Sequence, residues 1–560
     1  MNRIRQYQFN YGHITFPYWL AQWKIKMFKW KSISKSLNRE RFTVNNLIDV
    51  NILNSLYTGD INTESQQILL GKRKILFYED ADSDYDVKVR WEGNRLHDLV
   101  ILAMDADSYE SWDYVLQKLK KETLEDILIN SNAMEVSVSV INLLAVTSLL
   151  SSKGIKYPEE IISDFLNKAA LYIINNIEMS IKRSNNHYFF DLLGLLWLCN
   201  CVKSTKYVTE LYSYASDEMS SLLQNCLNND GSLYEGSTYY HKYMLDSLLT
   251  YLVFFSSCRH KDKLIKYAKS MYAFCNYIRV NDNIIGIGDN DSGRVLPLPS
   301  YFEYCSYDMA YTDNLYKMLD TQIINSDSVR NINFTDTRTS FGIQILKKGR
   351  FTVALRCENA LNAKIRRIIG GHCHNDQGSF QLYINDWLCC TEKGTYSYSL
   401  KDGSREGNML TSAHNTVVIN SLEQDAISKN WDYKARITYG TVKSDSTDCV
   451  KCTINKKDNP AYTHKRTVKV DDVVTITDSI TADTFSEFTR YIHLVPEAII
   501  QSVKDKRINI NYLDGFTMEF DENSQAEVNT YYYSAEYGVK KEASVIILRS
   551  SKKEGYMKIY

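Results

Sequence analysis

The sequence predicts a multidomain α + β protein, in which an N-terminal α/α toroid (an incomplete helical barrel) is followed by a C-terminal antiparallel β-sandwich. The chain has 560 residues, and single cores stop growing at roughly 250–300 residues. Residues 90–325 contain little Gly or Pro, and their apolar residues recur at helical spacing. From about residue 335, β-branched and aromatic residues alternate with polar ones, which is typical of strands.

The helical half is predicted from a series of amphipathic runs joined by short turns. Turn residues occur at Asn228–Gly231 and between Gly286 and Gly293. Successive helices with short connections pack as antiparallel hairpins, and many hairpins in sequence indicate a toroid or a solenoid. No fixed-period repeat is visible in the sequence. The clearest helical runs are Val136–Leu150, Phe189–Cys199, Met244–Phe255 and Leu264–Tyr277.

The β half is predicted from two hairpins and several isolated strands. Ser379–Cys390 is expected to turn at Asn385-Asp386, and Thr467–Thr477 at Asp471-Asp472. Strands this numerous, with no helices between them, favour an antiparallel sandwich. Three domains follow: a helical arm over 1–90, the toroid over 91–330 and the sandwich over 331–560. The other strand-like stretches are Asn415–Ile419, Val450–Asn455, Phe488–Leu494, Phe516–Phe520 and Ala543–Leu548.

Composition excludes some classes of function. The chain has 66 basic and 67 acidic side chains, so its net charge is −1 and it is no general nucleic-acid binder. A polyanion would need a local basic cleft. The sequence contains no run of 18 or more apolar residues, so it predicts no membrane span. The N-terminus has no clear signal peptide, so we expect a cytoplasmic protein as written, or a periplasmic or secreted one if a leader is missing.

The 12 cysteines show no framework of a small secreted domain. The one CxxC motif, Cys449–Cys452, lies in a strand-like run without a second pair, and we interpret it as incidental. Other cysteines lie in apolar helical runs, where buried free thiols are expected. This usage favours a reducing compartment. The helical cysteines are Cys199, Cys226, Cys258 and Cys275.

Two polar clusters lie at predicted helix starts. Ser184-Asn185-Asn186-His187 opens an apolar helix, where Asn is also a common cap. An amide and an imidazole at a helix N-terminus could hold a carboxylate. The second cluster runs from Asp230 through Glu235 to Tyr239, Tyr240 and His241. Taken alone, Tyr and His residues at a helix start are more often packing residues than catalysts.

Two further clusters lie in loops and strands. Gly288–Arg294 is a polar turn bounded by glycines, and it lacks the spacing and terminal Glu of an EF-hand. Gly370–Asp376 carries His372 and His374, which project to one face of an extended strand. With Glu392 and His414 downstream, two imidazoles and a carboxylate make a plausible zinc site. The alternative is a pair of hydrogen-bonded strand histidines.

Together these clusters, in this order, resemble the heparinase II/III-like polysaccharide lyases. The resemblance covers roughly residues 90–420, and it implies the same order of an α/α toroid and a β-sandwich. The segments that carry it are NNHYFFDLLGL, DGSLYEGSTYYHKY, GDNDSGR, GGHCHNDQGSFQLYINDWLCCTEKGTYSY and SAHNTVVIN.

The resemblance also implies roles for individual residues. Asn186 and His187 would neutralise the substrate carboxylate, Tyr240 would be the catalytic tyrosine, and His372 the histidine that faces the sugar. Substrate contacts are expected at Glu235, Tyr239, His241 and Arg294. A structural zinc ion would be bound by His374, Glu392 and His414. Glu392 stands where relatives usually carry Asp, and Lys393 where they usually carry Pro.

The implied activity is β-elimination on a uronic-acid-containing polysaccharide, with no organic cofactor. The enzyme would neutralise the uronate carboxylate, abstract the proton at C5 and release O4. One alternative is a glycoside hydrolase, which needs two carboxylates about 5–10 Å apart; Glu235 with Asp289 or Asp291 are candidates. Another is a non-catalytic glycan-binding protein of a surface-polysaccharide pathway. The sequence predicts neither the glycan nor the oligomeric state.

Overall fold

The fold is taken from a computed structural model of the chain. It describes residues 16–38, 40–56, 87–105, 109–179, 185–297, 306–322, 340–357, 372–398, 404–427, 438–457 and 460–560. Ser184, Gly370 and Gly371 of the predicted motifs lie outside these ranges, as do most of the predicted N-terminal arm and the predicted domain boundary near residue 330.

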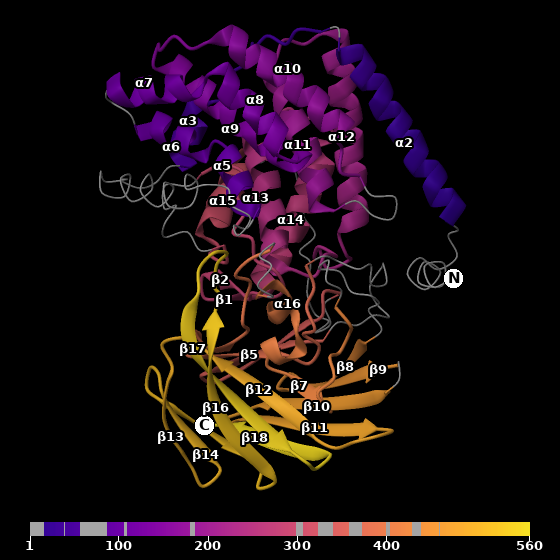
Figure 1. Cartoon of the computed structure of the whole chain (residues 1–560), viewed down its shortest axis with the longest axis vertical. Coiled ribbons are helices and arrows are strands. Elements are labelled where there is room, and N and C mark those ends of the chain that lie inside the picture. The colour runs from indigo at the N-terminus through magenta and orange to yellow at the C-terminus, as the bar shows by residue number, and fades with distance from the viewer. Residues whose placement is uncertain are drawn as a thin grey trace.

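The N-terminal half is helical, as predicted, and its helices stand side by side above the sheets (Figure 1). Three of the four helical runs expected from the sequence lie within helices, and the fourth, Met244–Phe255, extends one residue beyond its helix. The helices are α2 (Phe16–Leu37), α3 (Val50–Leu56), α5 (Val87–Asn94), α6 (His97–Asp105), α7 (Tyr109–Lys118), α8 (Lys121–Asn130), α9 (Ala133–Ser152), α10 (Glu159–Asn175), α11 (Asn186–Cys201), α12 (Lys206–Cys226), α13 (Thr238–Phe254), α14 (Lys261–Tyr277) and α15 (Ala310–Gln322).

Helix α9 is the central helix of this half. Every residue from Ala133 to Leu150 is buried, and α9 packs against α6, α10 and α11. A helix that is apolar on all sides belongs in a core. Its start is fixed by Asn132, whose side chain accepts the backbone N–H of Glu135 at 2.9 Å. Among the described residues, α9 is the one helix long and apolar enough to cross a membrane, and its burial marks it as a core helix.

Helix α2 belongs to the predicted arm, and it packs against α10 and α12. Trp30, Ile33 and Leu37 are buried in the same hydrophobic core as the toroid helices. The described part of the arm is therefore packed onto the helical domain.

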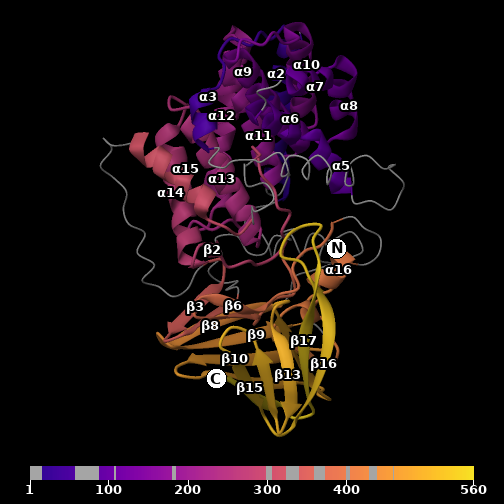
Figure 2. The ribbon, with the colours of Figure 1, turned by 90° about the vertical axis from the view of Figure 1, so that its left-hand side faces the viewer.

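The C-terminal half contains two antiparallel eight-stranded sheets, confirming the predicted sandwich (Figure 2). One sheet has the order β13-β14-β15-β18-β11-β10-β9-β8; the other runs β16-β17-β12-β6-β5-β4-β3, with β7 paired to β12. The strands are β3 (Ile343–Lys348), β4 (Phe351–Arg356), β5 (Phe380–Ile384), β6 (Trp387–Thr391), β7 (Val417–Ile419), β8 (Tyr439–Ser446), β9 (Cys449–Lys456), β10 (Tyr462–Val470), β11 (Val474–Ala482), β12 (Phe488–Leu494), β13 (Ile499–Lys504), β14 (Arg507–Asn511), β15 (Phe516–Phe520), β16 (Ser524–Tyr533), β17 (Lys541–Ser550) and β18 (Glu554–Ile559).

Both predicted hairpins are present. Strands β5 and β6 are joined by Asn385 and Asp386, which have φ angles of 51° and 63°. Two left-handed residues in a two-residue loop match the right-handed twist of the strands, and Asn and Asp tolerate that conformation. Strands β10 and β11 close at the pair Val470 and Val474.

The cysteine prediction is partly wrong. The four cysteines expected in helical runs are free and buried, as expected, although Cys258 lies in the turn between α13 and α14. Cys452 of the CxxC motif, however, forms a disulfide with Cys357, 95 residues away in sequence. Disulfides persist in oxidising compartments, so this bond weighs against the reducing compartment that the cysteine usage favoured. The spacing gave no sign of the pair, because the fold brings the two strands together.

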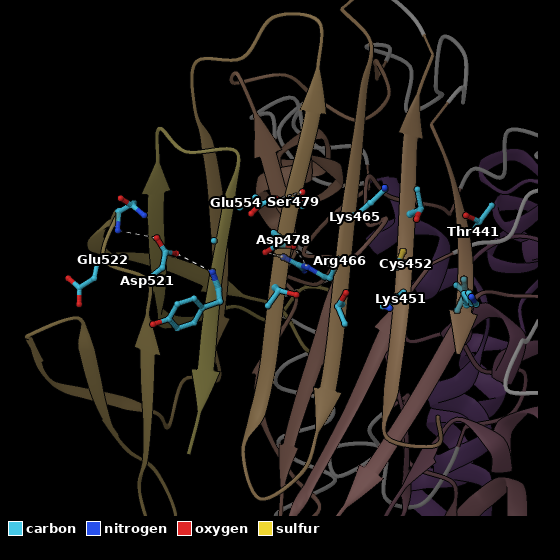
Figure 3. A pocket seen from close by; sticks show the side chains of 18 residues that line it. Thr441, Lys451, Cys452, Lys465, Arg466, Asp478, Ser479, Asp521, Glu522 and Glu554 are labelled. Carbon is cyan, nitrogen blue, oxygen red and sulfur yellow. Dashed lines mark hydrogen bonds and ion pairs between the residues drawn. The ribbon is translucent and has the colours of Figure 1, made fainter. Parts of the chain in front are cut away.

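A groove of about 1040 Å³ runs across β8, β9, β10, β11 and β18 (Figure 3). Its lining includes Asp478, which is buried and accepts hydrogen bonds from Arg466 and Arg490 at 2.8 and 2.7 Å. The two guanidinium groups hold the pKa of this carboxyl well below its usual range, although burial alone would raise it. The charge beneath the groove is therefore compensated within the sandwich.

The two halves meet along the segment that follows the small hairpin of β1 (Arg279–Val280) and β2 (Asn283–Ile284). The backbone N–H of Asp289 donates to the carbonyl of His372 at 3.1 Å, and Asn290 Nδ2 donates to the carbonyl of Ala535 at 2.7 Å. On the helical side, the hydroxyl of Ser237 donates to the carbonyl of Asp289 at 2.6 Å. This segment holds the start of α13 against the β half, where the predicted site lies.

Candidate active site at the seam

Tyr240 and His372 come from the two halves of the chain and stack on each other. Their ring centroids are 3.6 Å apart, and the ring planes differ by 18°. Tyr240 lies in the first turn of α13, where the hydroxyl of Ser237 caps the helix by accepting the Tyr240 N–H at 3.2 Å. Helix capping thus places the phenol, which is only 5% exposed, at the seam.

The phenol of Tyr240 donates a hydrogen bond to the hydroxyl of Tyr398 at 3.2 Å. Burial raises the pKa of Tyr240 well above its ordinary value, and the negative charges of Asp291 and Asp289 add to the shift. At neutral pH, Tyr240 is therefore a neutral phenol that can donate a proton.

Asp289 orients His372. Its carboxylate lies 3.1 Å from His372 Nδ1 and 2.8 Å from His374 Nε2, and it also binds the guanidinium of Arg405. Burial alone would raise the pKa of Asp289, but the Arg405 charge and the two histidine contacts hold it well below its usual range. An ionised Asp289 favours the proton on Nδ1 of His372, which leaves Nε2 as the acceptor nitrogen.

Arg405 holds this network in place through its ion pair with Asp289. It is buried, and its guanidinium carbon lies 4.7 Å from the ring centroid of Tyr398. A cation over an aromatic face is attracted to it, and the contact fixes both side chains. Arg405 therefore connects the carboxylate behind His372 to the tyrosine that accepts the Tyr240 hydrogen bond.

Glu235 joins His372 to the start of α11. One carboxylate oxygen accepts the backbone N–H of Asn186 at 2.7 Å, and the other lies 3.4 Å from His372 Nε2. An acidic group at a helix N-terminus is favourable because it satisfies a free N–H and opposes the helix dipole. Glu235 was predicted as a substrate contact, and its observed contacts are with these two site residues.

The side chain of Asn186 is fully buried at the first position of α11. Within the described residues, neither its Nδ2 nor its Oδ1 has a hydrogen-bond partner. Buried amides are nearly always hydrogen-bonded, because an unsatisfied group costs about 1–3 kcal/mol. The helix cap itself is Asn185, so capping does not explain Asn186.

His187 faces an acidic partner and is 32% exposed. Its Nδ1 lies 3.0 Å from Glu178 Oε1. Burial alone would lower the pKa of His187, but the hydrogen bond and charge of Glu178 raise it to about 9. The imidazole is therefore positively charged at neutral pH.

Tyr239 and His241 do not face the Tyr240–His372 stack. His241 is fully buried; its Nδ1 accepts the Leu233 N–H at 3.1 Å and its Nε2 lies 3.0 Å from the Met271 carbonyl. Burial lowers the pKa of His241 to about 4. This placement corrects the expected substrate contact, since both nitrogens serve the backbone. Tyr239 instead lines a separate cavity.

Arg294 follows the segment that carries Asp289 and Asp291. Its backbone carbonyl lies 3.5 Å from the hydroxyl of Tyr243, which is buried in α13. Its predicted contact with a substrate stays a prediction.

The residues expected to bind zinc lie near one another. The rings of His374 and His414 have centroids 5.2 Å apart, and His414 Nδ1 lies 3.3 Å from Glu392 Oε1. Nε2 of His414 is buried and has no hydrogen-bond partner among the described residues, which suits a ligand. Nε2 of His374, by contrast, faces Asp289. Across the described ranges, no group of three or more His, Cys, Asp or Glu side chains is arranged to hold a metal.

Sequence reasoning missed the network behind His372. Asp289 lay in a turn that we had weighed only as a possible carboxylate of a hydrolase, and Tyr398 lay unassigned in the Gly-Thr-Tyr-Ser-Tyr segment. Nothing in the sequence marked Arg405 as a site residue, because a single Arg in a short polar stretch is common. A buried carboxylate needs a cation, and that need could have prompted a search for one.

Comparisons with known proteins show which family and which folds the chain resembles. Residues 339–560 match the family described as heparinase II/III-like, C-terminal. A crystal structure of heparinase III superimposes with a TM-score of 0.65 at 13% identity, covering 98% of this chain and 92% of that one. The heparan sulfate lyase HepC from Pedobacter heparinus gives a TM-score of 0.56 at 14% identity, with coverages of 96% and 88%. None of the curated protein sequences matches the chain. The resemblance seen in the sequence is thus confirmed: the chain has the fold of heparinase III and carries the heparinase II/III-like C-terminal domain.

Proposed function

We propose that this protein is a polysaccharide lyase that cleaves a uronic-acid-containing polysaccharide by β-elimination. One observation carries the proposal: a neutral phenol, Tyr240, stacks on His372, while Glu235 connects His372 to the start of α11, which carries Asn186. An acid, a base and an unpaired amide thus lie around one seam. Support also comes from the structural neighbours, which include heparinase III and a heparan sulfate lyase.

The uronate carboxylate would be bound at the start of α11. The C5 proton is weakly acidic while the neighbouring carboxylate carries full charge, so the enzyme must neutralise that charge. The unpaired amide of Asn186 can donate to one carboxylate oxygen, and the charged imidazole of His187 can oppose the developing negative charge. Removing one such preorganised donor typically costs about 3–4 kcal/mol of transition-state stabilisation.

His372 would remove the proton from C5. Its Nδ1 is held by ionised Asp289, so the neutral imidazole would carry its electron pair on Nε2. Glu235, whose carboxylate lies 3.4 Å from Nε2, would stabilise the imidazolium that forms. The C5–H electron pair then forms the C4–C5 double bond. Tyr240 donates its proton to the departing O4, which suits a phenol whose pKa is raised. Before the next turnover, water accepts the extra proton from His372 and returns a proton to Tyr240.

A glycoside hydrolase fits the geometry less well. Glu235 and Asp289 lie on the two nitrogens of His372, but Asp289 is fully buried and occupied by Arg405, His372 and His374. A carboxylate so strongly stabilised as an anion is a poor acid and cannot reach a sugar as a nucleophile.

Zinc remains a proposal. His414 and Glu392 are suitable ligands, whereas His374 would first have to release Asp289. The zinc would be structural, bracing the chain next to His372, and no catalytic step depends on it. Elemental analysis of the purified protein tests this proposal. About one zinc per chain would support the site, and a protein that is active without metal would exclude it.

Incubation with heparan sulfate, hyaluronan, chondroitin and alginate tests the activity. The proposal expects near-ultraviolet absorbance from the new C4–C5 double bond on at least one of them. New reducing ends without that absorbance would identify a hydrolase. Binding without turnover across the panel would support the non-catalytic glycan-binding alternative.

A further inference from the structure

A second cavity is lined by Tyr239, the residue next to Tyr240 in the chain. It has a volume of about 380 Å³ and lies between the β1–β2 hairpin and strands β5 and β6, with β16 and β17 at its edge. Neither Tyr240 nor His372 lines it. Its most unusual feature is its aromatic lining, which comprises Tyr239, Tyr307, Tyr383, Trp387, Tyr512 and Tyr533.

Trp387 at the start of β6 is the exposed member of this group. Its side chain is 58% exposed. An exposed indole at the mouth of an aromatic cavity gives no stability to the fold, since it buries little area. Aromatic faces with polar tips are suited to ligands that have one apolar face and many hydroxyls, as sugar rings do.

Polar groups lie at the floor of the cavity. Gln381 Nε2 donates to the Gly286 carbonyl at 2.6 Å, and the Tyr383 hydroxyl donates to Gln381 Oε1 at 3.1 Å. The Tyr239 hydroxyl packs against Gly286, where any Cβ would lie 1.9 Å from it. Glycine is therefore required at 286 for Tyr239 to point into the cavity.

The charges around this cavity differ from those of the catalytic seam. Lys541 is the one cation among its described lining residues. Of its three described lining carboxylates, Asp282 and Asp386 are paired with Arg279 at 2.8 Å and Lys347 at 2.9 Å, and Glu497 is the third. Its described lining residues include no arginine, whose guanidinium could hold a carboxylate or sulfate at two points. The chemistry therefore suits an uncharged sugar.

We propose that this cavity is a second, non-catalytic binding site for neutral sugar units of an oligosaccharide. The sugar ring would stack on Trp387, and its hydroxyls would bond the tyrosine hydroxyls beneath. The site goes beyond the proposed lyase activity and does not depend on it, since binding here needs no turnover. Adjacent residues, Tyr239 and Tyr240, would then serve two different sites.

Binding of cellotetraose and chitotetraose to the full chain tests the proposal. Saturation-transfer NMR and tryptophan fluorescence would be measured on the Tyr240→Phe protein, so that turnover cannot interfere. We expect saturable binding of at least one of these sugars, and a loss of about tenfold in affinity in Trp387→Ala, as is usual for a central aromatic contact. Tyr512→Ala gives an independent second variant with the same expected direction.

Tyr532→Ala is the matched control, because Tyr532 is 54% exposed on β16 but does not line the cavity. It should keep full affinity. The proposal is overturned if neither neutral sugar binds saturably, or if Trp387→Ala and Tyr512→Ala leave binding intact. It is also overturned if a galacturonic acid tetramer binds the same residues more tightly than the neutral sugars. A failed lyase assay would leave each of these results unaffected.

Discussion

His372 and Asp289 form a hydrogen bond of 3.1 Å across the seam between the helical and β halves. The bond connects a histidine that faces Tyr240 to a buried carboxylate held by Arg405. A general base oriented by a fixed carboxylate is a recurrent arrangement, because the carboxylate selects one tautomer of the imidazole. Several consequences can be measured.

Asp289→Asn should lower kcat by about 10²–10⁴-fold, since the amide no longer selects the proton on Nδ1. It also leaves Arg405 buried without its anion, so the protein should lose about 3–5 kcal/mol of stability. Kinetics at a temperature where the variant is folded separate the two effects. An Asp289→Asn variant that is folded and fully active would contradict the orientation of His372.

Asn186→Ala should lower kcat/KM because it removes a donor to the substrate carboxylate. The loss should correspond to about 3–4 kcal/mol of transition-state stabilisation. The free energy of unfolding should hardly change, since the amide has no partner among the described residues. Denaturant unfolding measures stability. A large loss of stability with little loss of activity would show that Asn186 is structural.

The His187 charge predicts an alkaline limit to substrate binding. The pKa of His187 is raised to about 9, so its pairing with Glu178 contributes fully below the ordinary value of about 6.5 and is lost as pH rises through about 9. KM should therefore rise above about pH 9. In His187→Gln the rise should disappear. An unchanged profile in that variant would exclude His187 from carboxylate binding.

His241 predicts a loss of stability in acid. Its pKa is lowered to about 4, whereas the unfolded chain takes up the proton near 6.5. The unfolded state then binds more protons, so stability falls as pH drops from about 6.5 towards 4, by roughly 3 kcal/mol. His241→Gln, which keeps a donor and an acceptor, should reduce this dependence. The free energy of unfolding, measured between these pH values for the wild type and the variant, tests this prediction.

Much of the fold could be predicted from periodicity and turn chemistry. Strand β12 spans Phe488–Leu494 as expected, and the Asn385-Asp386 turn takes the left-handed conformation that its residues favour. These features are local, so the sequence contains them. The Cys357–Cys452 disulfide joins residues 95 positions apart, and no local pattern predicts such a pair.

The site was predicted in part for the same reason. Tyr240 and His372 stood out in motifs, but their ring contact depends on how the two halves pack. His241 stood beside Tyr240 in the same motif, yet helical rotation turns it into the core, where Met271 and Leu233 hold it. The role of Arg405 could not be predicted from the sequence, because it depends on the burial of Asp289 in the folded protein.

Tyr240→Phe tests the central claim most directly. The change removes one hydroxyl and keeps the ring that stacks on His372, so binding and folding should persist while kcat falls by about 10²–10⁴-fold. Tyr272→Phe is the matched control, since its hydroxyl bonds Asp313 within the helical half. On a uronan that the wild type cleaves, near-ultraviolet absorbance should be nearly lost in Tyr240→Phe and retained in Tyr272→Phe. Wild-type rates in Tyr240→Phe would contradict the assignment of Tyr240 as the acid.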